Sequence, residues 1–374
     1  MYIVKQLKND STSDISKFIK LEYKLYKGDL NWTAHLFIDT KAVLYGKKNP
    51  LFKNGEHVFF MVFDEKNEPV GRILAGIDAQ LNAVKGFRQG YFSMFECIND
   101  YKAAVLLFDA AVGWLKQRGM NTVIGPLSPS NSDDRKGFLV KGEGPPVLLN
   151  AYTKDYYAAL VEKYGFSKND DHLAYLFDPA EFNLKRHEKV VAFAKRRAHY
   201  TVDRLNKKDL WAESKDFKEI IDNSIPEDWD YLVAPTREGI MDEFKNLKQF
   251  YDGHFCYVAR AGTRPIGFLT ALPDYFQVLH RMNGKILPFG WYKFLRYRKK
   301  IDCVRAFTQM VVHDYQKKGV NHAMYLELYR DAVKMGIKSV EASCVDEKNY
   351  ESRLSIEKSG GNQYRTYRTY RYNF

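Results

Sequence analysis

The sequence predicts an α/β protein of the α+β kind, built from two domains that each place helices against a mixed, mostly antiparallel sheet. The first observation behind this prediction is length, because 374 residues exceed the ~100–200 that a single domain usually takes. The second is composition, since 45% hydrophobic and 15% aromatic residues can fill two cores. The third is an internal repeat, which sets the order of the elements.

Segments in the two halves match one another in the same order. FFMVFDEKNEPVGRILAGID at 59–78 matches FCYVARAGTRPIGFLTALPD at 255–274 with an offset of 196. YIVKQL at 2–7 matches YTVDRL at 200–205 with an offset of 198, and VEKYGF at 161–166 matches IEKSGG at 356–361 with an offset of 195. Nearly constant offsets indicate a duplicated domain. We therefore predict domains at 1–180 and 200–374, joined by a helix in the charged segment 181–199, which has no Gly or Pro.

Each copy is predicted to run β-α-β-β-β-α-β-α-β. An alternating strand opens it, a helix follows, and a hairpin with a Pro-x-Gly turn comes next. A further strand then leads into a long helix that ends at a glycine, Gly119 or Gly336. The predicted helices are 15–26 and 101–118 in the first copy and 217–223 and 322–335 in the second, and the strands that follow the long helices are 121–124 and 338–343.

The charge and the cysteines limit the class of protein. A net charge of +12 and a pI of about 9.2 favour anionic partners or simply lysine-rich faces. The four cysteines, Cys97, Cys256, Cys303 and Cys344, are far apart and form no CxxC pair, so we expect free thiols and no metal site. The N-terminus reads as a strand, and no apolar run approaches the ~18 residues of a membrane span. These features predict a cytoplasmic protein without a membrane partner.

The stretch DYQKKGVN at 314–321 stands where a strand runs into a helix through a glycine. Free backbone N–H groups and the helix dipole favour an anion at such a junction. Together with NYESRLSIEKSGG at 349–361, it resembles the GCN5-related N-acetyltransferase (GNAT) superfamily over roughly residues 200–374, and the repeat extends the resemblance to the first half. The resemblance implies tandem GNAT-like domains that bind acetyl-CoA or another acyl-CoA. The donor-binding residues that it implies are Met310, Val311, Val312, Gln316, Lys317, Lys318, Gly319, Val320, Asn321 and Asn349.

The first copy departs further from this pattern. Its equivalent loop, FECINDYKAA at 95–104, has no glycine, so we expect no coenzyme A binding there. The segment 125–150 is rich in Gly, Pro, Ser and Asn and is predicted to be a long loop, either a functional lid or a self-packed surface loop. Arg135 in it is a candidate clamp for a carboxylate of the substrate, and Tyr156 is a candidate contact in the same cleft.

Acyl transfer to an amine needs a general base and an acid for the leaving thiolate. His313 is a candidate base, and the alternative for it is a turn histidine. Glu96 stands at a comparable strand end in the first copy, and its alternative is a surface or ion-paired carboxylate. The resemblance places a tyrosine acid where this sequence has Ile356, so Tyr350 is the nearby candidate. His322 is expected only to begin a helix.

The terminal YRTYRTYRYNF at 364–374 alternates aromatic with polar residues and predicts a last strand rather than a nucleic-acid surface. The sequence thus predicts an N-acyltransferase, an N-acetyltransferase first of all, which uses acyl-CoA on a small-molecule or peptide amine bound near the C-terminal domain. Two alternatives stay open. One is a macromolecular donor, either acyl carrier protein or aminoacyl-tRNA, and the other is a binding module without catalysis. The oligomeric state is not predicted.

Overall fold

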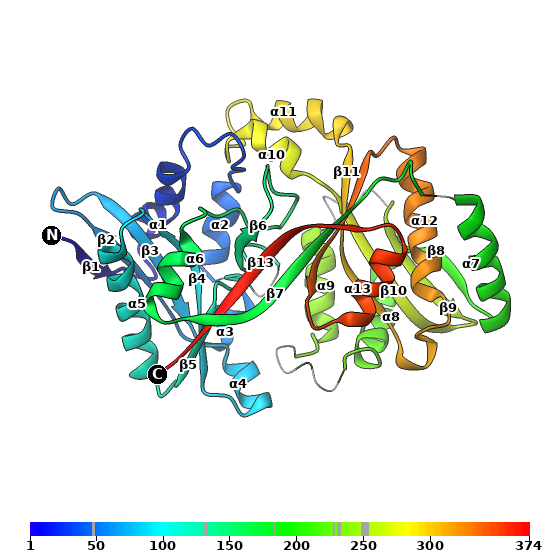
Figure 1. Ribbon diagram of the computed structural model, residues 1–374, viewed down its shortest axis with the longest axis horizontal. Helices are drawn as coiled ribbons and strands as arrows, with labels where there is room; N and C mark the ends of the chain where they lie inside the picture. The colour runs from blue at the N-terminus through cyan, green and yellow to red at the C-terminus, as the bar shows by residue number, and fades with distance from the viewer. Residues whose placement is uncertain (47–48, 131–132, 183, 227–228, 230–232, 248–253) are drawn as a thin grey trace. The chain divides into compact units, whose positions relative to one another are not determined.

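The computed structural model describes the chain except residues 47–48, 131–132, 183, 227–228, 230–232 and 248–253 (Figure 1). The chain divides into two compact units. Unit 1 comprises Met1–Leu173, Tyr275–Lys299 and Tyr364–Phe374, and unit 2 comprises Ala174–Asp274 and Lys300–Gln363. The predicted boundaries differ from this division, because they placed Tyr275–Lys299 and Tyr364–Phe374 in the second domain, whereas both segments belong to unit 1. The predicted connecting segment 181–199 contains α7 (Leu184–Ala198), which belongs to unit 2.

Unit 1 is built on a mixed sheet. The first four strands in its order are antiparallel, the fourth and fifth are parallel, and the last strand of the chain then pairs antiparallel with the fifth. The strands in spatial order are β1 (Ile3–Gln6), β2 (His57–Phe63), β3 (Pro69–Gly76), β4 (Gln89–Cys97), β5 (Thr122–Gly125), β13 (Asn362–Asn373) and β7 (Ser167–Phe177), and β6 (Phe138–Lys141) pairs with β13. The boundary of unit 1 falls within two of these strands, so unit 1 contains β7 up to Leu173 and β13 from Tyr364. The segment 125–150, predicted as a loop, therefore contains a strand.

Helices cover both faces of this sheet. Alternate residues of β2 point to opposite sides, so Val58 and Phe60 join the core under α5, while Phe59 and Met61 join the core under α1. The helices of unit 1 are α1 (Thr12–Leu25), α2 (Phe37–Leu44), α3 (Pro50–Asn54), α4 (Ala79–Lys85), α5 (Tyr101–Lys116), α6 (Tyr157–Tyr164), α10 (Phe276–Met282) and α11 (Gly290–Tyr297).

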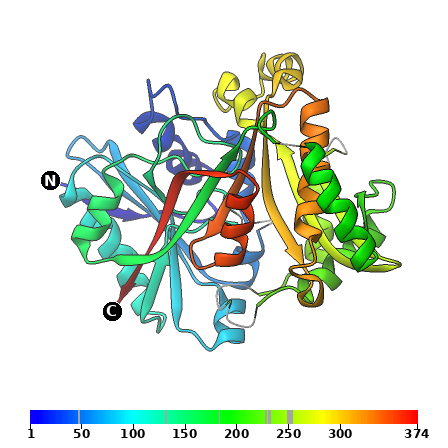
Figure 2. The ribbon, with the colours of Figure 1, turned by 45° about the vertical axis from the view of Figure 1, so that its right-hand side comes forward.

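Unit 2 repeats the same strand order and directions. Its described strands are β8 (Thr201–Arg204), β9 (Cys256–Ala261), β10 (Arg264–Pro273), β11 (Cys303–Val311) and β12 (Ser339–Asp346). Among these five, β11 and β12 pair parallel and the other neighbours pair antiparallel. Its helices are α7, α8 (Leu210–Asp222), α9 (Arg237–Leu247), α12 (Val320–Lys334) and α13 (Tyr350–Lys358), and Figure 2 shows α7 alongside α12. The predicted mixed sheets flanked by helices are confirmed. No helix in the described ranges is long and apolar enough to cross a membrane.

The C-terminal strand is part of the core of unit 1. The Tyr370 side chain is fully buried, and its hydroxyl donates to Glu162 Oε1 at 2.9 Å. We expect Tyr370→Ala to lower the free energy of unfolding of unit 1 by about 3–5 kcal/mol, because a large buried aromatic ring is lost. Urea denaturation measures the change. The exposed neighbour provides the control, since Arg371→Ala should cost about 0.5 kcal/mol or less. Equal stability of the two variants would show that β13 is not a core strand.

Candidate functional site

The strand edge before the glycine loop of unit 2 is open. β11 pairs with β12 only from Cys303 to Ala306, whereas its pairing with β10 continues to Val311. Beyond Ala306, no strand of the described chain pairs with the edge of β11 that faces away from β10. An extended ligand with amide groups can add to an edge of this kind.

The backbone groups at this edge are set by strand alternation. Val312 N–H donates to Ile266 O at 3.0 Å, so it points toward β10. Met310 has the same parity and also faces β10, which leaves Val311 as the one of these three predicted residues whose N–H and C=O face the open edge. In this structure Gln316 Nε2 donates to Val311 O at 3.3 Å.

Gly319 precedes α12 as its N-cap, with φ of 79° and no side-chain cap. A Cβ at this position would lie 2.9 Å from Ala194 Cβ of α7, so both the left-handed conformation and the packing require glycine. Val320 begins the helix and is buried. Asn321 is half-buried, and its Oδ1 has no hydrogen-bond partner among the residues that the structure describes. No described side chain therefore caps the first N–H groups of α12.

Two lysines bring positive charge to this helix start. Lys317 and Lys318 are exposed; Lys317 Nζ lies 3.2 Å from Glu351 Oε1, and Lys318 Nζ lies 4.6 Å from the centre of the Tyr315 ring. Exposed pairs of this kind are worth about 1 kcal/mol or less. Both ammonium groups are therefore available to an incoming anion.

The other predicted residues of this half have different surroundings. His313 is exposed, and its Nδ1 lies 3.4 Å from Gln316 Nε2. Asn349 caps α13, because its Oδ1 accepts from Ser352 N–H at 3.1 Å. Tyr350, the first residue of α13, is 65% exposed, whereas Ile356 is buried in the core.

The equivalent strand edge of unit 1 is closed. Ile98 N–H donates to Val70 O at 3.0 Å, so Cys97 faces the edge where β4 has parted from β5. There Cys97 N–H donates to the Tyr157 hydroxyl at 3.3 Å, and the Tyr156 hydroxyl donates to Cys97 O at 2.8 Å. The hydroxyl of Tyr156, a predicted substrate contact, thus lies at the strand edge of β4.

The helix after this edge is capped by a carboxylate. Asp100 Oδ1 accepts from Lys102 N–H at 2.8 Å at the start of α5, and Asp100 Oδ2 accepts from the Tyr2 hydroxyl at 2.8 Å. A negative group already fills the place that a phosphate would need. The two copies thus differ at both the strand edge and the helix start.

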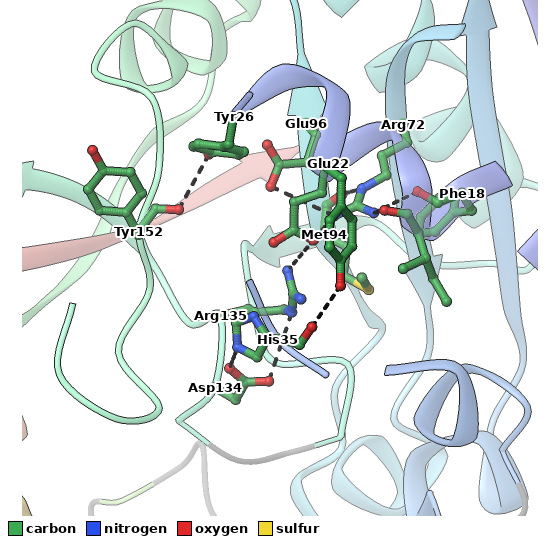
Figure 3. Close-up of polar contacts among 12 residues, drawn as sticks. Phe18, Glu22, Tyr26, His35, Arg72, Met94, Glu96, Asp134, Arg135 and Tyr152 are labelled. Atoms are coloured by element: carbon green, nitrogen blue, oxygen red, sulfur yellow. Dashed lines mark hydrogen bonds and ion pairs between the residues drawn. The ribbon is translucent and has the colours of Figure 1, made fainter. Parts of the chain in front are cut away.

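Unit 1 instead contains a cavity lined by buried charged groups (Figure 3). Its space is about 30 Å³, which holds roughly one or two water molecules and thus matches an ammonium group in size. Its lining comes from α1 and the following loop, β4, the segment 126–153 and α10, and consists of Glu22, Trp32, Thr33, His35, Met94, Phe95, Glu96, Pro126, Arg135, Gly137, Phe138, Pro146, Asn150, Ala151, Tyr152, Thr153 and Phe276.

Two arginines hold one carboxylate in this cavity. Glu22 Oε2 lies 2.7 Å from Arg72 Nη2 and 2.8 Å from Arg135 Nη1. Arg72, on β3, is wholly buried and also donates to the carbonyls of Phe18 at 2.6 Å and Met94 at 3.2 Å. Both arginines are thus committed to protein partners.

Glu96 lies farther from the arginines than Glu22 does. Its Oε1 lies 3.7 Å from Arg72 Nη2, and its Oε2 accepts from the Tyr157 hydroxyl at 2.6 Å. Nearby, His35 Nε2 lies 2.7 Å from Asp134 Oδ1, while its buried Nδ1 has no hydrogen-bond partner within the described part of the chain.

The surroundings shift the pKa values of the two glutamates in opposite directions. Burial raises the pKa of Glu96 to about 7, because the opposing attraction of Arg72 is too weak and the Glu22 charge adds to the rise. Burial also raises the pKa of Glu22, but Arg135 and Arg72 outweigh it and lower that pKa to about 2. For Asp134, burial is outweighed by His35 and Arg135, so its pKa is lowered. One carboxyl thus changes its charge near neutral pH.

Sequence reasoning singled out Glu96 and Arg135 but missed Glu22, Arg72 and the His35–Asp134 pair. A signal for Arg72 exists in the repeat. Gly71 pairs with Cys97 as Gly267 pairs with Val311, so Arg72 and Glu96 correspond to Phe268 and Met310. Charged residues in one copy at positions that are apolar in the other point to a function special to the first copy.

No family model matches the sequence. The chain is 29% identical over 368 residues to Protein YghO of Escherichia coli K12, covering 96% of this chain and 92% of that protein. It is 28% identical over 375 residues to a bacterial ceramide synthase of Caulobacter vibrioides, covering 96% and 94%.

Solved structures match the whole chain. A tandem GNAT protein from the clavulanic acid biosynthesis pathway has a TM-score of 0.59 at 10% identity and is covered to 98%. A GCN5-related N-acetyltransferase from Sphaerobacter thermophilus has a TM-score of 0.54 at 11% identity and is covered to 95%. The resemblance seen in the sequence is confirmed, and the protein has the tandem fold of the GCN5-related N-acetyltransferases.

Proposed function

We propose that this protein is an acyltransferase that moves an acyl group from an acyl-CoA to the nitrogen of an amine. The tandem GNAT fold and the relative named bacterial ceramide synthase support this. A ceramide is the amide of a fatty acid with a long-chain amino alcohol. A long acyl group and a long-chain amine are therefore the first substrates to test, with acetyl-CoA as the short end of the series.

The observation that carries the donor proposal is the open edge of β11, which runs into the uncapped start of α12. The pantetheine arm of coenzyme A has two amides, and these pair with strand groups such as those of Val311 and Gln309. The diphosphate then meets the free N–H groups of α12 and the charges of Lys317 and Lys318.

Unit 1 does not offer a second donor site in this proposal. Tyr156 and Tyr157 fill the matching strand edge, and Asp100 caps the matching helix. The asymmetry supports a division of labour between the copies. The donor is assigned to unit 2, and the cavity with buried charged groups distinguishes unit 1.

Glu96 is the proposed general base. An ammonium must lose a proton before its nitrogen attacks a thioester, and a base with a pKa near the working pH does this best. The raised pKa of Glu96, about 7, meets that condition, and Tyr157 fixes the carboxylate orientation. Arg135 is paired with Glu22, so the proposed acceptor needs no carboxylate of its own.

The test is release of free coenzyme A by purified protein supplied with acetyl- to palmitoyl-CoA and with short and long-chain amines. We expect turnover that rises with the chain length of donor and acceptor. Absence of transfer from every acyl-CoA would overturn the proposal. Transfer from acyl carrier protein or aminoacyl-tRNA alone would support the acyltransferase activity but contradict acyl-CoA as the donor.

The donor site has a separate prediction. The double variant Lys317→Glu/Lys318→Glu should weaken acyl-CoA binding by about tenfold or more, because two attractions to the diphosphate become repulsions. Calorimetric titration measures it. Lys215→Glu, at an exposed position on α8, is the matched control and should bind as wild type does. Gly319 variants are a poorer test, because α7 packing alone forbids a side chain there. Unchanged affinity in the double variant would place the donor elsewhere.

A further inference from the structure

An apolar surface lies on the part of unit 1 contributed by residues 275–299, which we name the α10–α11 segment (yellow in Figure 1). Its connecting turn and last helix expose large apolar side chains. Leu287 is 74% exposed, Phe289 70% and Trp291 51%. Ile286, Tyr292 and Leu295 are exposed beside them. Isolated exposed apolar residues are ordinary, but a cluster in one short segment marks an interaction surface.

The same segment is strongly basic. It has six Arg or Lys residues and no Asp or Glu, and all six are exposed: Arg281, Lys285, Lys293, Arg296, Arg298 and Lys299. Aromatic, aliphatic and basic side chains together are typical of a helix that lies in the interface of an anionic bilayer.

The segment is anchored from beneath, so its exposed face is fixed. Gly284 lies against α1, where a Cβ would meet the Tyr23 hydroxyl at 2.3 Å, and Gly284 O accepts from Phe37 N–H at 3.1 Å. Phe294 turns inward from α11 and stacks on Tyr275 with ring centres 5.8 Å apart. These contacts hold the apolar residues of α11 outward before any partner binds.

We propose that the α10–α11 segment docks this protein peripherally on a membrane surface rich in anionic phospholipid. The aliphatic residues Ile286, Leu287 and Leu295 insert among acyl chains and have no use in stacking on nucleic-acid bases. A second copy of the same surface would bring like charges together. An anionic membrane can bind both the apolar and the basic side chains of the segment. A nucleic acid would bind the basic side chains alone, and a second copy of this chain would bind the apolar ones alone.

This proposal departs from the expectation of no membrane partner, which rested on the lack of a spanning segment. It also connects the surface to the site in unit 1, because Phe276 at the start of α10 lines the cavity that contains Glu96. Docking would bring a lipid-borne amine to that wall. The docking itself does not require acyl transfer, so either proposal can fail without the other.

The experiment is co-sedimentation of the full chain with vesicles of phosphatidylcholine, with and without phosphatidylglycerol, and with no substrate present. We expect binding to the anionic vesicles that weakens as salt rises. Leu287→Ser/Phe289→Ser/Trp291→Ser and Arg296→Glu/Lys299→Glu should each lower the partition coefficient by about tenfold or more. Circular dichroism confirms that each variant is folded.

Matched controls come from the same unit. Leu30→Ser and Lys17→Glu/Lys20→Glu alter exposed residues elsewhere and should leave vesicle binding unchanged. The proposal is overturned if anionic vesicles bind no better than neutral ones, or if the controls lose binding as much as the segment variants. Binding of the segment to an oligonucleotide but not to vesicles would overturn it too, as would self-association that the segment variants abolish without any vesicle binding.

Discussion

Glu96→Gln is expected to lower kcat by about 10²–10⁴-fold while acyl-CoA affinity stays within about twofold of wild type. The amide keeps the shape of the carboxyl and accepts from Tyr157, but it cannot take a proton from an ammonium. Loss of binding together with turnover would indicate a structural role instead. Glu56→Gln, at an exposed glutamate of the same unit, serves as the matched control and should keep full activity.

The pH profile is the sharper readout. A base with a pKa of about 7 must be deprotonated to act, so log(kcat/KM) should rise with pH up to about 7 and then level off. In Glu96→Gln that rise should vanish from the residual activity. A wild-type rate independent of pH between 5 and 8 would contradict the role of Glu96.

Stability provides a check that does not depend on activity. The folded-state pKa of Glu96 is raised above its unfolded value, so the folded state favours the protonated form. This contribution to stability is fully present below about pH 4.5 and is lost as pH rises through about 7. Glu96→Gln should therefore remove one titration step from the pH dependence of the free energy of unfolding.

The elements that the sequence predicted correctly are those with local causes. The hairpins, the glycine-ended long helices and the terminal strand each follow from residues near one another in the chain. The Pro-x-Gly residues lie in the second strand of each hairpin, however, and not in the predicted turn. The returns of residues 275–299 and 364–374 to unit 1 were not predicted, because a strand pattern does not say which sheet the strand joins. The alternating pattern of β13 predicts a strand, but it does not indicate which of the two units contains the sheet that buries Tyr370.

The site shows the same limit. Glu96 and Arg135 attracted notice by their places at a strand end and in an unusual segment. Glu22 did not, because a glutamate among the lysines of an amphipathic helix reads as solvated, and only packing against β3 and residue 135 buries it. The repeat places Arg72 opposite Phe268 in the alignment of the two copies. Only the strand register shows that Arg72 pairs with Glu96 where the second copy pairs Phe268 with Met310.

Arg72→Ala is expected to lower the free energy of unfolding of unit 1 by about 3–5 kcal/mol at neutral pH. The change removes the donor at 2.7 Å from Glu22 and leaves the Phe18 and Met94 carbonyls without their guanidinium partner. Arg118→Ala is the matched control. Arg118 pairs with Glu56 at 2.8 Å at the surface, where an ion pair contributes about 1 kcal/mol or less.

A double-mutant cycle with Glu22→Gln separates the charge pair from the loss of packing. If the ion pair dominates, Arg72→Ala should cost about 1–3 kcal/mol less in the Glu22→Gln background. The pH dependence of this stabilisation follows from the pKa of Glu22, which is lowered to about 2. The stabilisation by the ion pair is present above about pH 4.5 and is lost as pH falls toward 2, so the difference in stability between wild type and Arg72→Ala should become smaller in acid. Additive losses that persist undiminished at low pH would mean that Arg72 stabilises unit 1 through packing and its bonds to the Phe18 and Met94 carbonyls, and not through the ion pair with Glu22.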